Sequence, residues 1–291
     1  MNIVSEDMMK IAWIGTGVMG KPMALHLADA GYDVICYNRT YEKAKALEPK
    51  VKVAKDIESC VKNVDIVFSI VGYPSDVKET YDEVMKHVNR NTILVDMTTS
   101  SPTLAIELEE KARKKGLYML DAPVTGGDIG AKNATLSIMV GGSEEVYQKV
   151  LPLLKHLGKT ITYMGKPGNG QHAKLANQTA IAGAIAGIAE ALTYAKVKGL
   201  DQKDMLSVIT GGSANSWQAT NNGPKMISKD YAPGFYIKHF LKDLKLVLEE
   251  KNDLPLEVVT QVARVYQILS DQNMQDDGTQ AIIAYYLRRI N

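Results

Sequence analysis

The stretch that decides the fold runs Ile11-Ala12-Trp13-Ile14-Gly15-Thr16-Gly17-Val18-Met19-Gly20, an apolar segment that ends in glycines spaced G-x-G-x-x-G. Glycines at this spacing let the backbone turn sharply and approach a pyrophosphate, which binds free N–H groups at the start of a helix. An amphipathic helix over 21–30 and a second strand over 33–38 are expected next. This context favours a dinucleotide site, and a purely structural glycine turn is the alternative.

The end of the expected strand 33–38 bears on which dinucleotide fits. In the NAD version an Asp or Glu about 20 residues after the glycines binds the ribose 2′-hydroxyl. Here the chain reads Tyr37-Asn38-Arg39-Thr40, without a carboxylate. The paired donors and fixed charge of Arg39 suit a 2′-phosphate, so NADP is favoured over NAD, with Asn38, Arg39 and Thr40 as contacts. The alternative is that Arg39 is an ordinary solvated charge.

Composition limits the class of protein. The chain has 291 residues, enough for about two domains, and its 45% hydrophobic and 23% charged residues match a globular protein. A net charge of +1 gives no electrostatic reason to expect nucleic acid or a membrane surface as partner. Cys36 and Cys60 form no disulfide framework, which fits a reducing cytoplasm, and the histidine spacing indicates no metal site.

Two segments resemble targeting or membrane sequences only superficially. Residues 1–10 include Glu6 and Asp7 and have no apolar core, so they are interpreted as a short extension and not a signal peptide. The stretch 179–195 is rich in Ala, Ile and Gly, but Glu190 interrupts it and it is shorter than the roughly 20 residues of a membrane span. A closely packed, buried helix is expected there.

The pattern of elements predicts two domains. Strands and helices alternate up to about residue 165, which is typical of a parallel, doubly wound Rossmann sheet. Further strands are expected at 66–71, 93–96, 118–121, 136–141 and 160–164, with helices at 42–48, 76–88, 102–115 and 144–157. Later segments are helical, at 171–198, 201–211, 213–228, 237–252, 255–271 and 278–289. We therefore expect an NADP-binding domain over 1–167 and an all-helical domain over 168–291. A long helix is expected to join the two domains, and the helical domain is expected to complete the active-site cleft.

A second glycine-containing motif lies at 121–131 and reads Asp-Ala-Pro-Val-Thr-Gly-Gly-Asp-Ile-Gly-Ala. Its Thr125-Gly126-Gly127 offers a hydroxyl and adjacent N–H groups without obstructing side chains, which suits a carboxylate. A plain Gly-Gly turn is the alternative.

Two lysines in the helical half are candidates for chemistry. Lys174, Asn177 and Gln178 are spaced so that they share one face of an otherwise apolar helix, although a lysine near a helix start is usually only solvated. Lys242 stands beside Asp243, and from sequence alone this pair is expected to be a surface ion pair of little energy.

The glycine turn and the segments 121–131, 168–178 and 238–244 occur in the order found in the 3-hydroxyacid dehydrogenase family, which includes 3-hydroxyisobutyrate dehydrogenase and tartronate semialdehyde reductase. The resemblance extends from residue 10 to about residue 285. It implies that Lys174, in a G-x-G-x-x-x-K pattern, is the catalytic lysine, and that Thr125, Gly126 and Gly127 bind the substrate carboxylate. Asn177 and Gln178 would orient the substrate. The remaining expected cofactor contacts are Val71, Thr99 and Lys242.

The sequence thus predicts an NADP-dependent oxidoreductase that interconverts a small 3-hydroxy acid and its semialdehyde, with Lys174 as general acid and base and no metal. A homodimer or homotetramer is expected from the family. One alternative is an imine reductase, in which the matching position is usually not lysine. Another is a catalytically silent binding or reader protein, which would be expected to have lost the lysine or the carboxylate loop. Contacts to the distal part of the substrate are expected around Trp217 and Phe235.

Overall fold

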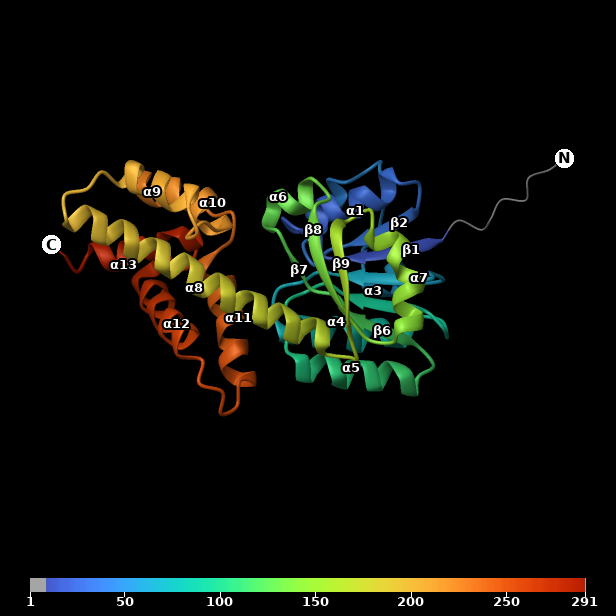
Figure 1. The fold of residues 1–291 in the computed structure, drawn as a ribbon. Coiled ribbons are helices and arrows are strands. Elements are labelled where there is room, and N and C mark those ends of the chain that lie inside the picture. Colours follow the sequence, from blue (N-terminus) through green and yellow to red (C-terminus); the bar gives the residue numbers. More distant parts are fainter. Residues whose placement is uncertain (1–8, 291) are drawn as a thin grey trace. The chain divides into compact units, whose positions relative to one another are not determined.

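The computed structural model describes residues 9–290, so most of the expected N-terminal extension (residues 1–8) lies outside the described residues. The chain divides after Lys174 into two compact units, here called the N-terminal unit and the C-terminal unit. Figure 1 shows that the first contains the sheet and the second is built of helices.

One sheet forms the centre of the N-terminal unit, with the strand order β3-β2-β1-β4-β5-β6-β8-β7 and with β9 paired to β8. The strands β1 to β6 run parallel to one another and follow the Rossmann order that the sequence predicts. Their bounds are β1 Lys10–Ile14, β2 Asp33–Tyr37, β3 Lys52–Val53, β4 Ile66–Ser69, β5 Ile93–Asp96, β6 Tyr118–Asp121, β7 Val124–Thr125, β8 Leu136–Gly141 and β9 Gly158–Gly165.

The Rossmann fold is confirmed, but the expected parallel direction of the strands ends at β6. The strand β8 runs antiparallel to β6, through the pair Asp121 and Gly141, and antiparallel to β7. Here residues 122–135 include β7 and the short helix α6 (Gly127–Lys132), which turn the chain back along the sheet. The result is a mixed sheet at this edge, with β9 parallel to β8.

Helices cover both faces of the sheet, which explains why its central strands are apolar throughout. Every residue of β4 and β5 is buried. The helix α1 (Gly20–Asp29) and the helix α7 (Glu144–Leu154) pack with one core cluster, and α3 (Ile57–Val61), α4 (Pro74–His87) and α5 (Pro102–Lys114) pack with the other. The short helix α2 (Tyr41–Lys45) follows β2. This double covering is the expected doubly wound architecture.

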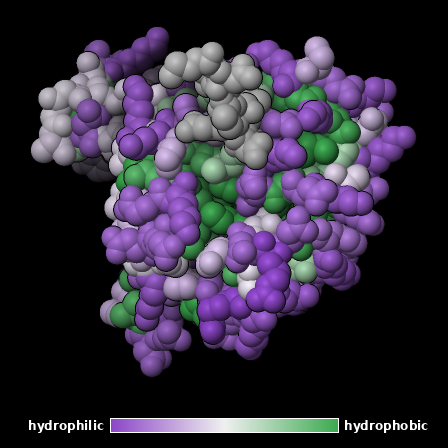
Figure 2. Space-filling model, turned by 90° about the vertical axis from the view of Figure 1, so that its right-hand side faces the viewer, coloured by the Kyte–Doolittle hydropathy of each residue, from purple (hydrophilic) through white to green (hydrophobic). Residues whose placement is uncertain are grey.

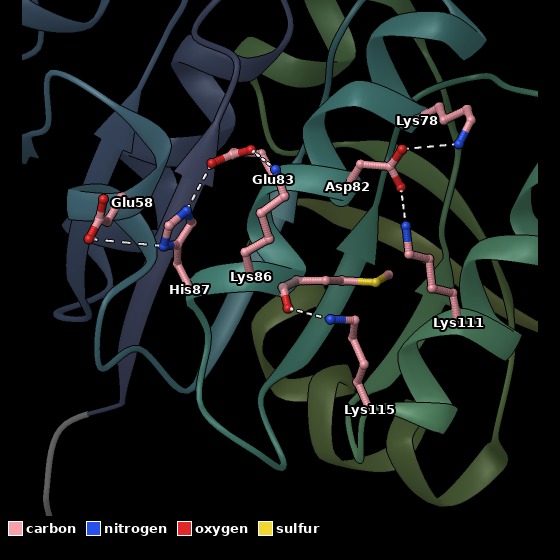
Figure 3. Close-up of polar contacts among 9 residues, drawn as sticks. Glu58, Lys78, Asp82, Glu83, Lys86, His87, Lys111 and Lys115 are labelled. Carbon is pink, nitrogen blue, oxygen red and sulfur yellow. Dashed lines mark hydrogen bonds and ion pairs between the residues drawn. The ribbon is translucent and has the colours of Figure 1, made fainter.

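Polar contacts connect the helices α3, α4 and α5 at the surface (Figure 3). Asp82 accepts hydrogen bonds from Lys78 and Lys111, and His87 lies 2.8 Å from Glu83 and 4.0 Å from Glu58. Such exposed pairs contribute about 0–1 kcal/mol each, so packing of the apolar faces holds these helices. Figure 2 shows a largely hydrophilic surface with smaller hydrophobic areas between the polar side chains.

The regular elements of the C-terminal unit are helices, as expected, and an isolated antiparallel β-bridge joins Tyr236 and Gly278. The helix α8 (Asn169–Val197) begins in the N-terminal unit and continues into this one. It is followed by α9 Gln202–Gly211, α10 Trp217–Ser228, α11 Ile237–Glu250, α12 Glu257–Leu269, a π-helical turn Ser270–Met274, a 3-10 turn Thr279–Ala281 and α13 Ile282–Leu287.

Of the helices in residues 9–290, α8 is the one long and apolar enough to cross a membrane by length and composition. A core helix passes the same test. Ala182, Ile185, Ala189 and Leu192 of α8 are fully buried in the helical core, together with Phe240 and Tyr266. These four residues of the stretch 179–195 thus pack in the core of the C-terminal unit, and 44% of the apolar window of α8 is buried.

Candidate active site

The glycine turn between β1 and α1 is shaped by two glycines that leave no room for a side chain. Gly15 has a φ of +97°, and a Cβ there would overlap the carbonyl oxygen of Ile70. A Cβ on Gly20 would overlap the carbonyl oxygen of Gly15. These positions let the turn fold back on itself and let α1 start against the ends of β1 and β4.

The middle of the turn is open, in contrast to its two ends. Gly17 is exposed, and a Cβ on it would meet no atom within 4 Å. The hydroxyl of Thr16 is buried and has no hydrogen-bond partner within the described part of the chain. Free space for close approach beside an unsatisfied polar group fits a phosphate lying on the turn. Val18 and Met19 complete the turn, with Val18 exposed and Met19 half-buried.

Asn38 holds the glycine turn in place from the end of β2. Its Oδ1 accepts a hydrogen bond from the N–H of Thr16 at 2.9 Å, and its Nδ2 donates to the carbonyl of Thr40 at 3.0 Å. The amide thus joins the turn to the loop in which Arg39 lies. Asn38 was predicted as a cofactor contact, and the structure also gives it this positioning task.

Arg39 lies on the surface, with 84% of its side chain exposed, and pairs with Asp76 at 3.3 Å. Asp76 is in the first turn of α4, where its other oxygen accepts a hydrogen bond from the N–H of Tyr73 at 2.9 Å. The carboxylate near the expected ribose end of the cofactor site therefore comes from α4 and not from β2. Sequence spacing gave no sign of it, because the two residues are 37 positions apart.

Buried hydrogen bonds join the carboxyl ends of β4 and β5. Asp96 accepts from the hydroxyl of Ser69 and from the N–H of Thr98, each at 3.0 Å, and Ser69 also contacts the hydroxyl of Tyr81 at 2.8 Å. The hydroxyl of Thr98 accepts from the N–H of Val71 at 2.9 Å. Burial raises the pKa of Asp96 to about 6, against the opposing effect of these hydrogen bonds. The network fixes the loops that carry Val71 and Thr99.

The segment from Thr125 to Gly127 lies where β7 leads into α6. Thr125 pairs with Ser137 of β8, and Gly126 and Gly127 follow with φ values of +129° and +62°. Glycine is strongly favoured at successive positive φ, and a Cβ on Gly127 would meet no atom within 4 Å. The loop therefore presents backbone that side chains do not cover, as a carboxylate site requires.

The start of α8 is bonded directly to the carboxyl ends of β5 and β6. The two oxygens of Asp121 accept hydrogen bonds from the N–H groups of Gly168 and Gln171, each at 2.8 Å. The side chain of Gln171 accepts from the N–H of Ser100 at 2.9 Å and donates to the carbonyl of Thr98 at 2.8 Å. Burial raises the pKa of Asp121 to about 6, and its bonds to N–H groups oppose that rise.

Lys174 lies three residues beyond Gln171 on the same helix, and it is buried with 5% of its surface exposed. A buried lysine is uncommon unless its ammonium group is used or paired. The alternative that Lys174 is an ordinary solvated lysine does not agree with this burial.

In the C-terminal unit, Gln178 and Lys242 are linked through Asp243. Gln178 donates to Oδ2 of Asp243 at 2.7 Å and accepts from Nδ2 of Asn177 at 3.2 Å. Lys242 lies 3.1 Å from Oδ1 of Asp243, and the two side chains are only 12% and 2% exposed. The expectation of a surface ion pair was wrong, because α11 turns Asp243 toward its buried face.

Sequence reasoning gave no role to Asp76, Asp96, Asp121 or Gln171. A signal was present for Asp121, a lone carboxylate at the end of an apolar strand in a segment already singled out.

Trp217 and Phe235, expected near the distal part of the substrate, are 58% and 37% exposed in the C-terminal unit. Within residues 9–290, no group of three or more His, Cys, Asp or Glu side chains could hold a metal ion.

Family models match both halves of the chain. Residues 10–165 match the NAD binding domain of 6-phosphogluconate dehydrogenase, and residues 168–286 match the NAD-binding domain of NADP-dependent 3-hydroxyisobutyrate dehydrogenase.

Curated relatives extend the likeness along most of the chain. A probable mitochondrial 3-hydroxyisobutyrate dehydrogenase-like protein of Arabidopsis thaliana is 42% identical, over 100% of this chain and 88% of that protein. The 2-hydroxy-3-oxopropionate reductase of Escherichia coli is 36% identical, over 86% of this chain and 87% of that protein. The NAD-dependent L-serine dehydrogenase of Pseudomonas aeruginosa is 34% identical, over 83% and 85%.

Solved structures agree with the fold. The 3-hydroxyisobutyrate dehydrogenase of Mycobacterium tuberculosis with L-serine has a TM-score of 0.88 at 30% identity, covering 95% of this chain and 98% of that one. A protein named Psf3, in complex with NADP+ and 2-OPP, has a TM-score of 0.87 at 25% identity, covering 94% and 99%. An imine reductase of Myxococcus stipitatus, at 19% identity and a TM-score of 0.66 over 97% and 99% of the two chains, shares the fold alone.

Proposed function

From its membership of the 3-hydroxyacid dehydrogenase family, we propose that this chain interconverts a small 3-hydroxy carboxylic acid and its semialdehyde with NADP. Members of this family are NAD(P)-dependent oxidoreductases that act on CH–OH groups, and this chain is one of them. The observation that carries this proposal is the buried Lys174, three residues after a helix turn bonded to the ends of β5 and β6. In Rossmann folds the carboxyl ends of the strands are where the cofactor binds.

The nicotinamide, when bound, supplies or accepts the hydride. Lys174 then handles the proton: its amine accepts the proton of the substrate hydroxyl during oxidation, and its ammonium group returns a proton to the oxygen during reduction. In the charged form it also stabilises negative charge on that oxygen, so the chain can perform this step with its own side chain.

The substrate carboxylate is assigned to the loop Thr125-Gly126-Gly127. The uncovered backbone of Gly127 and the hydroxyl of Thr125 supply uncharged donors, which suits a small acid. Asn177 and Gln178 are assigned to orient the substrate, since they follow Lys174 on α8 by three and four residues. The contact of Gln178 with Asp243 would hold its amide in one orientation.

NADP is proposed over NAD because the residues that follow β2, Asn38-Arg39-Thr40, include no carboxylate for the ribose. The NADP+ complex of Psf3 supports this preference, whereas the Pseudomonas relative is named NAD-dependent. The other proposed contacts are the glycine turn Gly15–Gly20, Val71, Thr99 and Lys242.

The test is a spectrophotometric assay of NADPH and NADH oxidation with a panel of small semialdehydes, repeated in the oxidative direction with 3-hydroxy acids. Turnover with at least one pair, faster with NADPH, is expected. Turnover of cyclic imines without turnover of any semialdehyde would replace this proposal with imine reduction.

A homodimer or homotetramer and a cytoplasmic location are proposed as well, to be checked by light scattering and by cell fractionation.

A further inference from the structure

The first turn of α8 is fixed to the sheet by a buried carboxylate. Asp121, the last residue of β6, is 4% exposed and bonds the N–H groups of Gly168 and Gln171. Both groups lie at the N-terminus of a 29-residue helix, where N–H groups have no partner within the helix. Hydrogen bonds that such N–H groups donate to a carboxylate are about twice as strong as neutral ones, and the helix dipole adds to their strength.

A second attachment reaches the loop after β5. The side chain of Gln171 is fully buried and uses both ends of its amide, one on Ser100 and one on Thr98. The hydroxyl of the same Thr98 accepts a hydrogen bond from the N–H of Val71, and the N–H of Thr98 donates to the carboxylate of Asp96. The start of α8 is therefore tied to the loops at the ends of β4, β5 and β6.

The first turn of α8 also packs closely against the backbone of β6 and β8, which restricts its position. A Cβ on Gly141 of β8 would lie 2.6 Å from both Oδ1 of Asp121 and the N atom of Gly170. A Cβ on Gly170 would overlap the carbonyl oxygen of Asp121. Hydrogen bonds and close contact thus define one position for the turn that precedes Lys174.

We propose that Asp121 and Gln171 are positioning residues of the enzyme, which fix the first turn of α8 on the strand ends and thereby set the place of the Lys174 amine. This inference rests on the proposed function of Lys174. Residues three and four apart in a helix lie on the same side, so a shift of the turn at Gln171 moves Lys174 with it. A misplacement of about 1 Å can cost about 100-fold in rate.

The experiment compares Asp121→Asn and Gln171→Glu in the full chain. Asn keeps the shape of Asp121 but loses one of the two acceptors, and Glu keeps the acceptor for Ser100 but loses the donor to Thr98. Each variant is expected to lower kcat about 10- to 100-fold, with little change in the Kd for NADPH. The matched control is Asp201→Asn, because Asp201 accepts from two N–H groups at the start of α9 and kcat should not change there.

A double-mutant cycle separates positioning from general structural damage. In a Lys174→Ala background, Asp121→Asn and Gln171→Glu should produce no further loss of kcat, because the group that they position is gone. A further loss as large as in the wild-type background would overturn the proposal, as would unchanged kcat in both single variants. If Asp121→Asn does not fold, Gln171→Glu alone completes the cycle.

Hydrogen exchange keeps this test independent of the proposed reaction. Amides of residues 168–174 should exchange at least 10-fold faster in both variants than in wild type, while amides of β1 and β4 keep their protection. Absence of turnover in wild type together with this faster exchange would remove the proposed function and leave the attachment of α8 standing. Unchanged exchange would overturn the attachment itself.

Discussion

Arg39 and Asp76 form an ion pair with 3.3 Å between the guanidinium and the carboxylate, although one lies in the loop after β2 and the other in α4. The side chain of Arg39 remains 84% exposed in this pair. Its backbone lies next to Asn38, which bonds the glycine turn through the N–H of Thr16 and the following loop through the carbonyl of Thr40. An exposed ion pair is weak, so the guanidinium of Arg39 can leave Asp76 and bind a phosphate instead.

Replacing Arg39 with Ala should raise the KM for NADPH about 10- to 100-fold, the equivalent of losing a hydrogen bond to a charged group worth about 1.5–3 kcal/mol. The KM for NADH should change far less, because NADH has no 2′-phosphate. Steady-state kinetics with both cofactors makes the comparison. Equal losses with the two cofactors would remove the assignment, and so would a wild-type preference for NADH.

The substrate loop can be tested at Gly127, because an added Cβ there meets no atom within 4 Å. A methyl group in Gly127→Ala would enter space that is open in the structure, where the substrate carboxylate is expected. The KM for the hydroxy acid should rise about 10-fold or more, the change expected for removing about 1.4 kcal/mol of binding, while the Kd for NADPH stays the same. Substitution at Gly126 is less informative, since Leu136 packs against that position.

Gly199→Ala is the matched control. Gly199 has a φ of +75°, close to the +62° of Gly127, and a Cβ there also meets no atom within 4 Å. Both substitutions therefore add the same backbone strain, of about 1–2 kcal/mol. If Gly199→Ala raises the KM as much as Gly127→Ala does, or if Gly127→Ala abolishes NADPH binding, the loop is not the carboxylate site.

The sequence predicts the Rossmann half well wherever the signal is local. Apolar runs such as Ile66–Ser69 and Ile93–Asp96 lie between turn residues, and both are strands of the expected order. The two-residue strands Lys52–Val53 and Val124–Thr125 are too short to show any periodicity. The antiparallel direction of β8 depends on which strand it pairs with, and no local pattern contains that information.

The site divides in the same way. The role of the glycines follows from their spacing, and the space around Gly17 agrees with it. The tasks of Asp121 and Gln171 depend on partners 47 to 73 residues away, which no motif reveals. The burial of Lys242 and Asp243 is also a tertiary property, since the residues themselves are typical of a surface.

Asp96 should make stability depend on pH in an uncommon direction. Burial raises its pKa from 3.8 to about 6 in the folded protein. Between these values the folded state binds a proton that the unfolded state does not, so this carboxyl stabilises the fold increasingly as the pH falls. Relative to Asp96→Asn, wild type should gain about 1 kcal/mol between about pH 7 and pH 5, measured by urea unfolding.

Asp56→Asn provides a contrast of opposite sign. Hydrogen bonds from Ser59 lower the pKa of Asp56, so its contribution is present at neutral pH and is lost only as the pH falls below the ordinary value for Asp. The difference between wild type and Asp56→Asn should therefore stay constant between pH 7 and pH 5. A constant difference for Asp96→Asn as well would show that Asp96 titrates normally.

Lys174 is the residue on which the proposed chemistry depends. Replacing it with Ala should lower kcat by about 10²- to 10⁴-fold, the usual loss for a general acid and base. NADPH binding should persist, because the glycine turn lies on β1 and α1 and not on α8. Stopped-flow measurement of hydride transfer, with fluorescence titration of NADPH, separates the two effects.

Lys174→Arg distinguishes proton transfer from simple charge. A guanidinium is not deprotonated at accessible pH, so it cannot accept the proton of the substrate hydroxyl, and this variant should be nearly as slow in oxidation as Lys174→Ala. If Lys174 only attracted the substrate carboxylate, Arg would restore much of the rate and the defect of the Ala variant would lie in KM. That second pattern would make Lys174 a binding residue and would require the proton donor to be another group of the chain.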